Sequence, residues 1–465
     1  MLRAEVQVVN VGLPLFADAV REQGRPVEQV DWRIPAGGDL AVVAALTRLY
    51  GPASDRVEAA NAEVLRRLDG AKPLLTDVRP VRDVVPDAGE RTLLHCGPAI
   101  GWADVCDPLR RSMRAAVVAE GWADGLDEAD RLLGSGGVAL EPANEHGMVV
   151  PMASAIGPSA PAYVVEDAGS GTRAFAPVGQ GPGEVAWFGR ETPAAIERLR
   201  FLRDVAGPVL AEIVHRNDPL DVFGLAAQGI QMGDDLHLRT QATTNLLVRG
   251  WLPDLVEIGG SAGAATARFL AGNHLFYLTI AMAAAKTLTT WAEKVPQASI
   301  VTTMARNGTT FGVRLAGSER WSVAAAPPVQ EAMYNPGQGP DTSAPDIGDS
   351  AVLELVGLGG AAAAGSPAVA AFVGGTMRDA RRATEQMAEI CVAESSRFTL
   401  PAMDFRGTPV GVDVRRVVEL GITPKVTTGI LHSHDGSGQV GAGVATAPPA
   451  CFVDALLDLD RRLSG

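Results

Sequence analysis

The chain has 465 residues, more than the roughly 100 to 200 of a typical single domain, so two or three domains are expected. Its formal net charge is −14, from 54 acidic and 40 basic residues, and Lys and Arg form no run. Because a nucleic-acid backbone requires clustered cations, this composition argues against a nucleic-acid partner.

Cysteine usage and the most apolar segment bear on location. The four cysteines include no CxxC pair, and the start "MLRAEVQVVNVG" lacks the basic stretch and apolar core of a signal peptide, so a reducing cytoplasm is expected. Residues 351–375 are apolar but contain Glu354, Pro367 and six glycines, which is too little apolar side chain for a membrane span. They are predicted to form buried helix and turns, and no membrane association is expected.

The N-terminal elements alternate between strand and helix. Strand-like "AEVQVVNVG", helical "PLFADAVREQG" and strand-like "PVEQVDW" form a β-α-β pattern that favours parallel pairing. Helical spacing follows in "LAVVAALTRLYG" and "SDRVEAANAEVLRRLDGA", and "KPLLTDVRPVRDVVP" returns to an extended pattern. These segments predict a small α/β domain over residues 1–90.

The rest of the chain divides by pattern into three regions. Glycine and proline punctuate short strands and helices over 91–190, which predicts an α/β core region. Residues 191–297 are nearly all helical in pattern, and 298–465 return to strands and glycine-rich loops. The predicted fold class is therefore α/β and multi-domain, with a small β-α-β domain, a helical middle region and a mixed α/β C-terminal region.

The segment "GIQMGDDLHLRTQATTNLL" gathers two carboxylates, an imidazole and a guanidinium: Asp234, Asp235, His237 and Arg239. On a helix predicted over 233–250, polar side chains recur on one face and could line a cleft or face water. The alternative is that the two aspartates simply cap the helix and meet its positive end.

Three further segments carry candidate groups. "ANEHGMVVPM" offers His146 beside Glu145 in a turn able to project into a cleft, or only a polar loop. "MARNGTTFGVRLAG" offers Arg306 and Asn307 for a small anion, or a hairpin turn at Asn-Gly. His95, after an apolar run, fits a structural histidine better than a ligand.

The C-terminal region adds acids and glycines. Asp341, Asp346 and Asp349 invite a Ca²⁺ or Mg²⁺ site, but EF-hand spacing is absent and Asp349 fits an N-cap. In "LHSHDGSGQVGAG" too little chain follows the G-x-G-x-x-G match for a dinucleotide fold, so NAD is rejected, and the pair His432 and His434 has no assignable third zinc ligand. The glycines can instead present N–H groups to an oxyanion. No Walker A loop occurs.

Taken together, the motifs resemble a known family. "VNVGLPLFADAVREQGRPVEQVDWRIPAGGD", "QMGDDLHLRTQAT", "ARNGTTFGVRLAG", "PDIGDSAVLELVGLGG", "DFRGTPVGVDVRRVVE" and "GSGQVGAG" are similar, in this order, to the YlbE/AllG family of bacteria. The family is associated with the FdrA protein and a third subunit as the oxamate carbamoyltransferase of allantoin breakdown. That reaction splits oxalurate with phosphate into oxamate and carbamoyl phosphate, which a carbamate kinase can use to make ATP.

The resemblance implies a set of site residues and no cofactor or metal. The positions that match are Asp235, His237, Arg239, Arg306, Asn307, Asp346, Asp349, His432 and Gln439. One segment departs from the family: where the family has a His-rich run leading to "VGPM", this chain reads "ANEHGMVVPM", and only His146, Pro151 and Met152 match. This difference implies that the chain acts on another ureido or carbamoyl compound if the missing histidines select the substrate.

Carbamoyl transfer explains why such residues would gather. A tetrahedral oxyanion, a phosphate and a carboxylate require fixed donors and a proton shuttle. The expected donors are Arg239, Arg306, Arg173 and the glycine-rich stretch 436–443, which includes Gly438 and Gly441. His237 is the expected shuttle, with Asp235 at the helix mouth, or Asp346 or Asp349, as its carboxylate partner. The site is thus predicted where helix 233–250 meets the loops at 306, 346 and 436.

Two other functions remain open from the sequence. One is a metal-dependent amidohydrolase acting on a ureide through His432, His434 and an aspartate. The other is a non-catalytic scaffold subunit whose β-α-β unit docks an FdrA-like partner through an exposed apolar edge or patch. In either case the chain is expected to form a homo- or hetero-oligomer.

Overall fold

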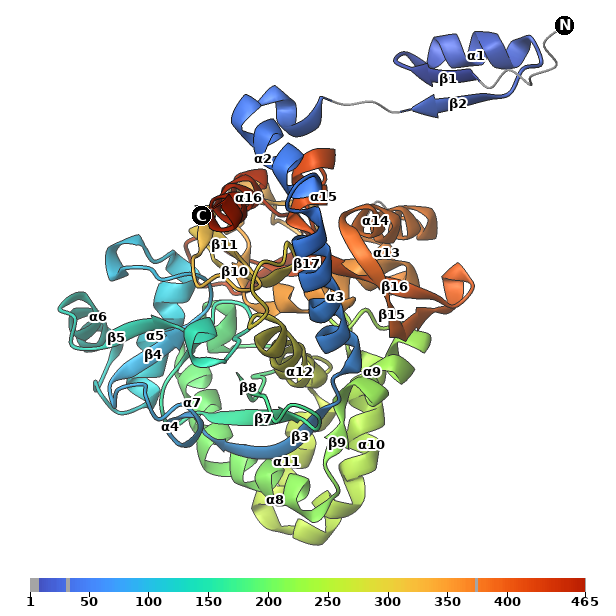
Figure 1. Ribbon diagram of the computed structural model, residues 1–465. Helices are drawn as coiled ribbons and strands as arrows, with labels where there is room; N and C mark the ends of the chain where they lie inside the picture. Colours follow the sequence, from blue (N-terminus) through green and yellow to red (C-terminus); the bar gives the residue numbers. More distant parts are fainter. Residues whose placement is uncertain (1–7, 31–33, 373–374, 465) are drawn as a thin grey trace, which may run out of the picture.

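A computed structural model of the chain describes residues 8–30, 34–372 and 375–464. It is a mixed α/β structure with several small sheets rather than one large one (Figure 1). The α/β class predicted from the sequence is confirmed.

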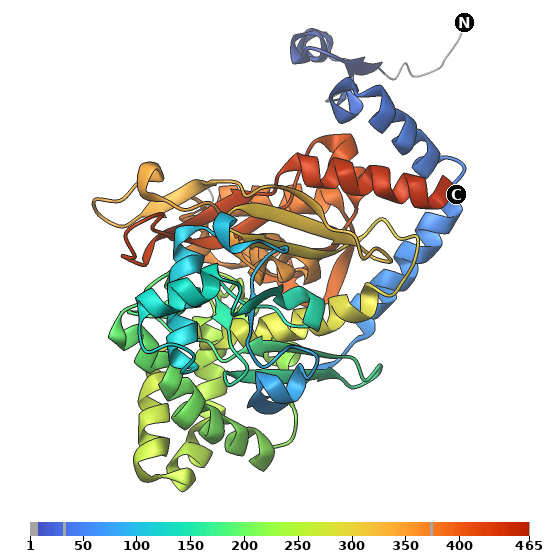
Figure 2. The same ribbon diagram turned by 90° about the vertical axis from the view of Figure 1, so that its left-hand side faces the viewer.

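The N-terminal unit, residues 8–30, consists of β1 (Val8–Val11), α1 (Pro14–Glu22) and β2 (Val27–Val30). Its strands pair in parallel with Val8 opposite Val27, as the β-α-β pattern predicted. Residues 4–7 and 31–32 of the predicted strands lie outside the described residues. The unit stands apart from the body in both views (Figures 1 and 2).

Two helices, α2 (Leu40–Tyr50) and α3 (Ser54–Gly70), lead from this unit into the body. The Asp39 carboxylate accepts the first free N–H groups of α2, which then packs on the C-terminal helix α16 (Pro449–Ser464). Farther on, β3 (Pro73–Pro80) pairs with β7 (Pro161–Asp167). Packing therefore crosses the boundaries predicted at residues 90, 190 and 297, and that division stays a prediction.

Residues 81–190 supply most strands of two sheets, to which β3 before them and β9 after them also belong. β4 lies between β5 and β6, and the other sheet has the order β8-β7-β3-β9. The remaining elements are α4 (Val81–Val84), β4 (Thr92–His95), α5 (Asp107–Ala119), α6 (Leu126–Gly134), β5 (Ala139–Pro142), β6 (Ala155–Ile156), β8 (Arg173–Pro177) and β9 (Leu220–Asp221).

The middle region is helical, as predicted, and α12 (Phe276–Ala292) runs through the largest hydrophobic core. It packs against β7 and β8 through alanines and other small side chains, which suits a chain with 47% hydrophobic but only 5% aromatic residues. The other helices are α7 (Pro193–Phe201), α8 (Gly207–Arg216), α9 (Val222–Gln231), α10 (Gln241–Ile258) and α11 (Gly260–Ala271), with a π-helical turn at Leu202–Ala206.

The helix predicted over 233–250 is wrong at its start. α9 ends at Gln231 and α10 begins only at Gln241, so residues 232–240 form a loop. Gly233 and Leu236 have φ of +98° and +67°, which no right-handed helix contains. Asp234 and Asp235 take the backbone N–H groups that a helix would use, which is how aspartate competes with helix formation.

The C-terminal region contains three sheets, ordered β12-β11-β10-β14, β13-β18-β17 and β15-β16. Its strands are β10 (Val301–Asn307), β11 (Thr310–Leu315), β12 (Ser322–Ala325), β13 (Val329–Tyr334), β14 (Ile347–Gly348), β15 (Cys391–Leu400), β16 (Arg406–Val412), β17 (Lys425–Leu431) and β18 (Gln439–Thr446). Its remaining helices are α13 (Pro367–Ala370), α14 (Met377–Ile390) and α15 (Val414–Leu420).

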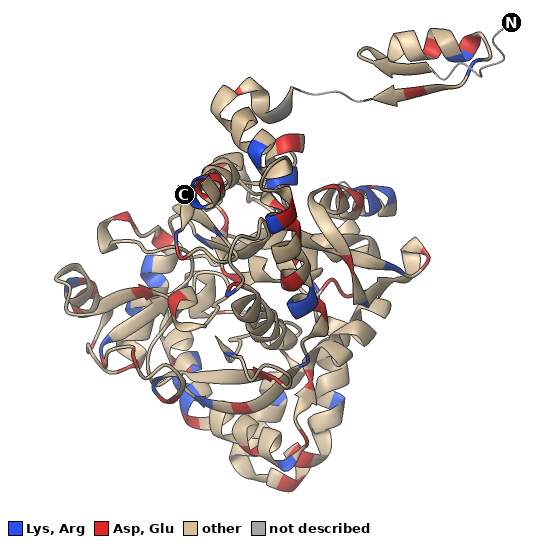
Figure 3. Ribbon diagram, viewed as in Figure 1, with Lys and Arg blue, Asp and Glu red and all other residues tan. Residues whose placement is uncertain are grey.

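The apolar segment that begins at residue 351 forms short buried 3₁₀ turns, as predicted for its described part. Over the described residues, no helix has the length and apolar character needed to cross a membrane. Acidic and basic side chains are interspersed along the chain (Figure 3).

Candidate functional site

A pocket of about 640 Å³, including its open mouth, lies where the loop 232–240 meets the C-terminal sheets. Its walls are mainly apolar, and its polar side chains are His237, His274, Ser350 and Gln439. The rest of the lining is Pro151, Met152, Trp187, Phe188, Leu238, Leu275, Leu278, Phe372, Gly429 and Ala442. Mostly apolar walls with a few convergent polar groups are typical of a small-molecule site.

His237 is held by Glu354, a residue that the sequence analysis did not select for the site. Nδ1 of His237 lies 2.8 Å from Oε1 of Glu354, and both side chains are buried. The same oxygen accepts N–H groups of Gly360 and Thr427 at 3.2 and 3.1 Å. Since Nδ1 faces the carboxylate, Nε2 is the ring nitrogen left for a ligand. A carboxylate in this position selects one tautomer and stabilises an imidazolium.

Gly359 makes this pair possible. A Cβ at Gly359 would lie 2.2 Å from Oε1 of Glu354 and 3.1 Å from Cβ of His237, and its φ of +57° is also unfavourable for other residues. The glycines of the "GLGG" segment, residues 357–360, therefore allow the backbone to pack directly on the side chains of His237 and Glu354.

The two aspartates of the loop 232–240 position it rather than face the pocket. Asp234 accepts the N–H groups of Ala242 and Thr243 at the start of α10, which agrees with the capping alternative. Asp235 accepts the N–H groups of residues 237–239. Burial raises the pKa of both carboxyl groups. Asp235 thus orients the backbone of His237, while the carboxylate at the imidazole is Glu354.

Two non-glycine residues beside the pocket have a left-handed backbone. Leu236 has φ of +67° and Met152 has φ of +49°. Gly348 packs closely on Met152, because a Cβ added to Gly348 would lie 2.5 Å from the backbone nitrogen of Met152. Strained backbone conformations concentrate at functional sites, and here they flank His237.

Arg306 is buried and paired within the protein, which gives its predicted substrate-binding role no geometric support. Its guanidinium is fully buried and binds Asp346 through two bonds of 2.7 and 2.9 Å. It also donates to the carbonyl of Gly348 at 2.6 Å. A buried charge must be paired, and Arg306 and Asp346 neutralise each other. Neither residue lines the pocket.

Asn307 forms the hairpin turn that the sequence left as its alternative. Its side-chain oxygen accepts the N–H groups of Thr309 and Thr310, and its amide donates to the Pro98 carbonyl. β10 and β11 pair in antiparallel fashion around it, with Gly308 at φ +80°. Asn307 is therefore a structural residue and not a ligand of the pocket.

Asp349 lies behind the pocket-lining Ser350 and is fully buried. Its two oxygens accept the N–H groups of Gly97 and Val150 at 2.8 and 3.1 Å. Burial raises the pKa of Asp349 to about 7, although the two N–H bonds act to lower it. It joins two distant backbone segments. It occupies the N-cap position of the 3₁₀ turn Ser350–Val352, as the sequence offered, but its side chain makes no capping bond there and does not line the pocket.

Three further predicted residues lie outside the pocket lining: His146, Arg173 and Arg239. Nε2 of His146 lies 2.6 Å from Oε2 of Glu141, and Arg173 forms an exposed pair with Glu166. The predicted roles of His146 and Arg173 are therefore not supported by geometry. Arg239 lies in the His237 loop with 38% of its side chain exposed, 3.4 Å from Asp234, and its substrate-binding role stays a prediction.

The glycine-rich stretch 436–443 contributes two residues to the pocket lining, Gln439 and Ala442. Its residues 439–443 belong to strand β18, whose backbone pairs with β13 and β17, so this part gives the predicted oxyanion cradle no geometric support. Gly438 and Gly441 instead allow close contact with Arg190 and with the Met333 carbonyl.

His432 does not line the pocket either. Its Nδ1 accepts N–H groups of His434 and Asp435. Within the ranges that the structure describes, no cluster of three or more His, Cys, Asp or Glu side chains is arranged to hold a metal. The amidohydrolase alternative therefore has no ligand set at this pair.

Site residues that remain unassigned from the sequence are Glu354, His274, Ser350 and Trp187. Glu354 has a usable signal, because it is the only charged residue of segment 351–375 and a buried charge marks a function or a partner. The other three are distinguished only by lining the same pocket as His237.

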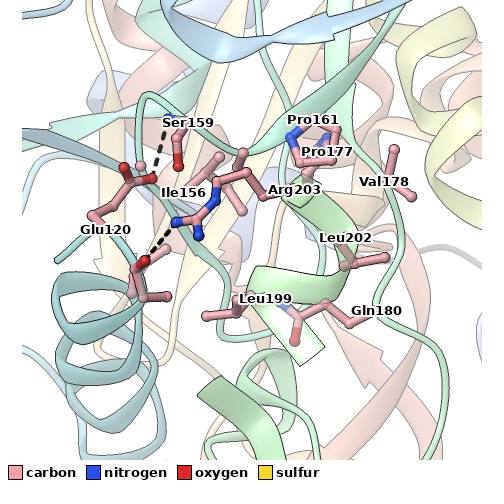
Figure 4. A pocket seen from close by; sticks show the side chains of 15 residues that line it. Glu120, Ile156, Ser159, Pro161, Pro177, Val178, Gln180, Leu199, Leu202 and Arg203 are labelled. Carbon is pink, nitrogen blue, oxygen red and sulfur yellow. Dashed lines mark hydrogen bonds between the residues drawn. The ribbon is translucent and has the colours of Figure 1, made fainter. Parts of the chain in front are cut away.

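A second pocket of about 450 Å³ lies beside the π-helical turn (Figure 4). Glu120 accepts the N–H of Ser159 at 3.1 Å, and Arg203 donates to the Ala119 carbonyl at 2.7 Å. Most polar groups here are engaged within the protein, and none of the predicted site residues lines this pocket.

The comparison with known proteins agrees with the sequence motifs. The family model "Oxamate carbamoyltransferase subunit AllG" matches residues 138–350. The oxamate carbamoyltransferase subunit AllG of Escherichia coli (strain K12) is 38% identical over 408 residues, which cover 86% of this chain and 97% of AllG. The chain belongs to the AllG family. The matched range contains His237 and Ser350, whereas Glu354 follows it.

Two other relatives share most of the chain. The uncharacterised protein YahG of Escherichia coli (strain K12) is 35% identical over 456 residues, covering 97% of this chain and 96% of YahG. A crystal structure of a conserved protein of unknown function from Enterococcus faecalis V583 has a TM-score of 0.84 at 33% sequence identity. It covers 87% of this chain and 97% of that chain, so the AllG-family fold is shared over most of its length.

Proposed function

We propose that this AllG-family chain is a subunit of a cytoplasmic carbamoyltransferase, which transfers a carbamoyl group between a ureido compound and phosphate. The observation that carries the proposal is the buried pair of His237 and Glu354 in the wall of a small-molecule pocket. The AllG relative named a subunit of oxamate carbamoyltransferase supports this chemistry.

In the proposed reaction a phosphate oxygen attacks the carbamoyl carbon of oxalurate. Nε2 of His237 takes the proton of the attacking phosphate and returns it to the leaving nitrogen as the carbon–nitrogen bond breaks. The products are carbamoyl phosphate and oxamate, and Glu354 stabilises the imidazolium that forms between these steps. The apolar wall of Trp187, Phe188 and Met152 limits water around the reacting carbon.

The pocket lining contains no Lys or Arg among the described residues, although the reaction handles a phosphate and a carboxylate. We therefore assign these charges to Arg239 and to partner subunits, namely an FdrA-like protein and a third subunit. This division fits a chain whose AllG relative carries the name of a subunit.

The divergent segment "ANEHGMVVPM" ends in Pro151 and Met152, which line the pocket. Because these two residues match the family, the differing positions before them would act on the substrate through the placement of Pro151 and Met152. We propose that it tunes which ureido compound binds, with oxalurate as the first one to test.

The decisive experiment measures carbamoyl phosphate formation from oxalurate and phosphate, using the purified chain alone and with both partner subunits. His237→Asn is compared with His146→Asn, because His146 also pairs with a carboxylate but lies outside the pocket lining. The proposal expects kcat to fall on the order of 100-fold or more in the first variant and to stay near wild type in the second. Equal effects of both variants, or no product with oxalurate or other ureides in the full mixture, would overturn it.

A further inference from the structure

The N-terminal unit, residues 8–30, exposes apolar side chains on several sides. Val9 and Val11 of β1 are 57% and 59% exposed, and Phe16 of α1 is 59% exposed. Eight of the sixteen exposed large apolar side chains among the described residues lie within the first 40 residues. Such a concentration marks an interaction surface rather than the scattered exposure of an ordinary surface.

The sheet of this unit is covered on one face only. Along β1 and β2 the more buried positions alternate with exposed ones, which places the face of Val8 and Val27 toward α1. Val9, Val11, Glu28 and Val30 therefore form a bare opposite face, which carries three valines and one carboxylate. Parallel sheets occur almost only where both faces are covered, so this face requires a partner.

The unit is also too small to be stable by itself. Ala17 is its only fully buried residue, and two-stranded sheets are marginal in water. Among the residues that the structure describes, each strand pairs only with the other, so β1 and β2 each have one free edge there. A free edge beside a bare apolar face allows another sheet to continue across it.

Two strands of four residues offer a face of roughly 130 Å², from about 3.3 Å per residue and 4.8 Å between strands, whereas a stable interface needs about 800 Å² from each partner. Any occupant must therefore also pair along the strand edges and bury the neighbouring side chains. A second copy of this chain would not continue the sheet in parallel, because a twofold axis would place the two free edges antiparallel to each other.

We propose that the N-terminal unit docks on a partner subunit by extending the edge of an open parallel α/β sheet, whose helices then cover the bare face. Glu28 is the one charged side chain on the bare face, and Asp18 and Arg21 pair with each other on α1 at 2.7 Å. Association is driven mainly by burial of the three valines and by backbone hydrogen bonds along the edge. The identity of the partner rests on the proposed function, which names an FdrA-like subunit as the first protein to test.

The experiment mixes the full-length chain with the FdrA-like subunit and records hydrogen exchange at residues 8–30 together with the mass of the complex. In the same mixture, completed with the third subunit, carbamoyl phosphate formation is assayed. The proposal expects amides of β1 and β2 to become protected at least about tenfold on complex formation. The double variant Val9→Asp, Val11→Asp should weaken binding on the order of tenfold, whereas Val256→Asp, an exposed apolar position on α10, should not.

The outcomes separate docking from catalysis. Protection at 8–30 without product would support docking and count against the proposed reaction. Product formation with residues 8–30 exchanging as fast as in the chain alone would overturn docking and leave the reaction standing. Protection at 8–30 in the chain alone, at the mass of a dimer, would overturn the proposal in favour of a second copy.

Discussion

His237 and Glu354 are 117 positions apart in the chain, yet Nδ1 of the histidine lies 2.8 Å from Oε1 of the glutamate. The pair forms because loop 232–240 and the 3₁₀ turns after residue 350 meet at β17, where Thr427 donates its N–H to the same carboxylate oxygen. This contact gives an otherwise unremarkable loop histidine a fixed ring orientation at the pocket wall.

Glu354→Gln should abolish most activity while leaving the fold intact. The amide oxygen can still accept the N–H groups, but the neutral side chain no longer stabilises an imidazolium, so kcat should fall about 100-fold or more with little change in KM. Steady-state kinetics of the complete complex measure this. Glu141→Gln, at the pair with His146, is the matched control, and a fall of similar size there would show that the effect is general to such pairs.

Gly359→Ala should both destabilise the protein and reduce activity. The new Cβ would overlap Oε1 of Glu354, so the free energy of unfolding should fall by about 2 to 4 kcal/mol. Gly260→Ala has a similar φ, +60°, but open space around the Cβ, so it should cost about 1 kcal/mol and leave kcat unchanged. Urea unfolding and kinetics of both variants decide whether the close contact or the backbone angle matters.

The ion pair of Arg306 and Asp346 should show strong coupling. Arg306→Met leaves a buried carboxylate without its partner and should lower the free energy of unfolding by about 3 to 5 kcal/mol. Adding Asp346→Leu should restore a good part of this loss, because the uncompensated charge is then gone. Urea unfolding of the two single variants and the double variant gives the coupling energy. Additive losses would contradict the buried pairing.

Asp349 should make the stability depend on pH. Its pKa in the folded protein is about 7 against 3.8 for the free group, so the folded state holds the proton more tightly, and the free energy of unfolding should fall as pH rises between these values and level above 7. Asp349→Asn removes this component, although its amide can accept only one of the two N–H groups. Its destabilisation relative to wild type should therefore be about 2.5 kcal/mol larger near pH 5 than near pH 8. A difference that stays constant with pH would contradict the raised pKa.

Local patterns in the sequence predicted local structure well. The β-α-β pattern predicted the parallel pairing of β1 and β2, and Asn307 followed by Gly308 offered the hairpin between β10 and β11. The helix at 233–250 failed at its start because Asp234 and Asp235 took its N–H groups, and periodicity alone cannot weigh that competition.

The sequence by itself therefore determined the α/β class, the β-α-β start, the helical middle and the family. It also singled out His237, because an imidazole between carboxylates and a guanidinium stands out in any chain. Only the tertiary structure decided that Glu354 holds this histidine and that Arg306 forms a buried ion pair with Asp346. Residue spacing within a segment predicts only which side chains of the same helix or strand lie close together. These two contacts join residues 117 and 40 positions apart, and only the packing of loops and sheets brings such residues together.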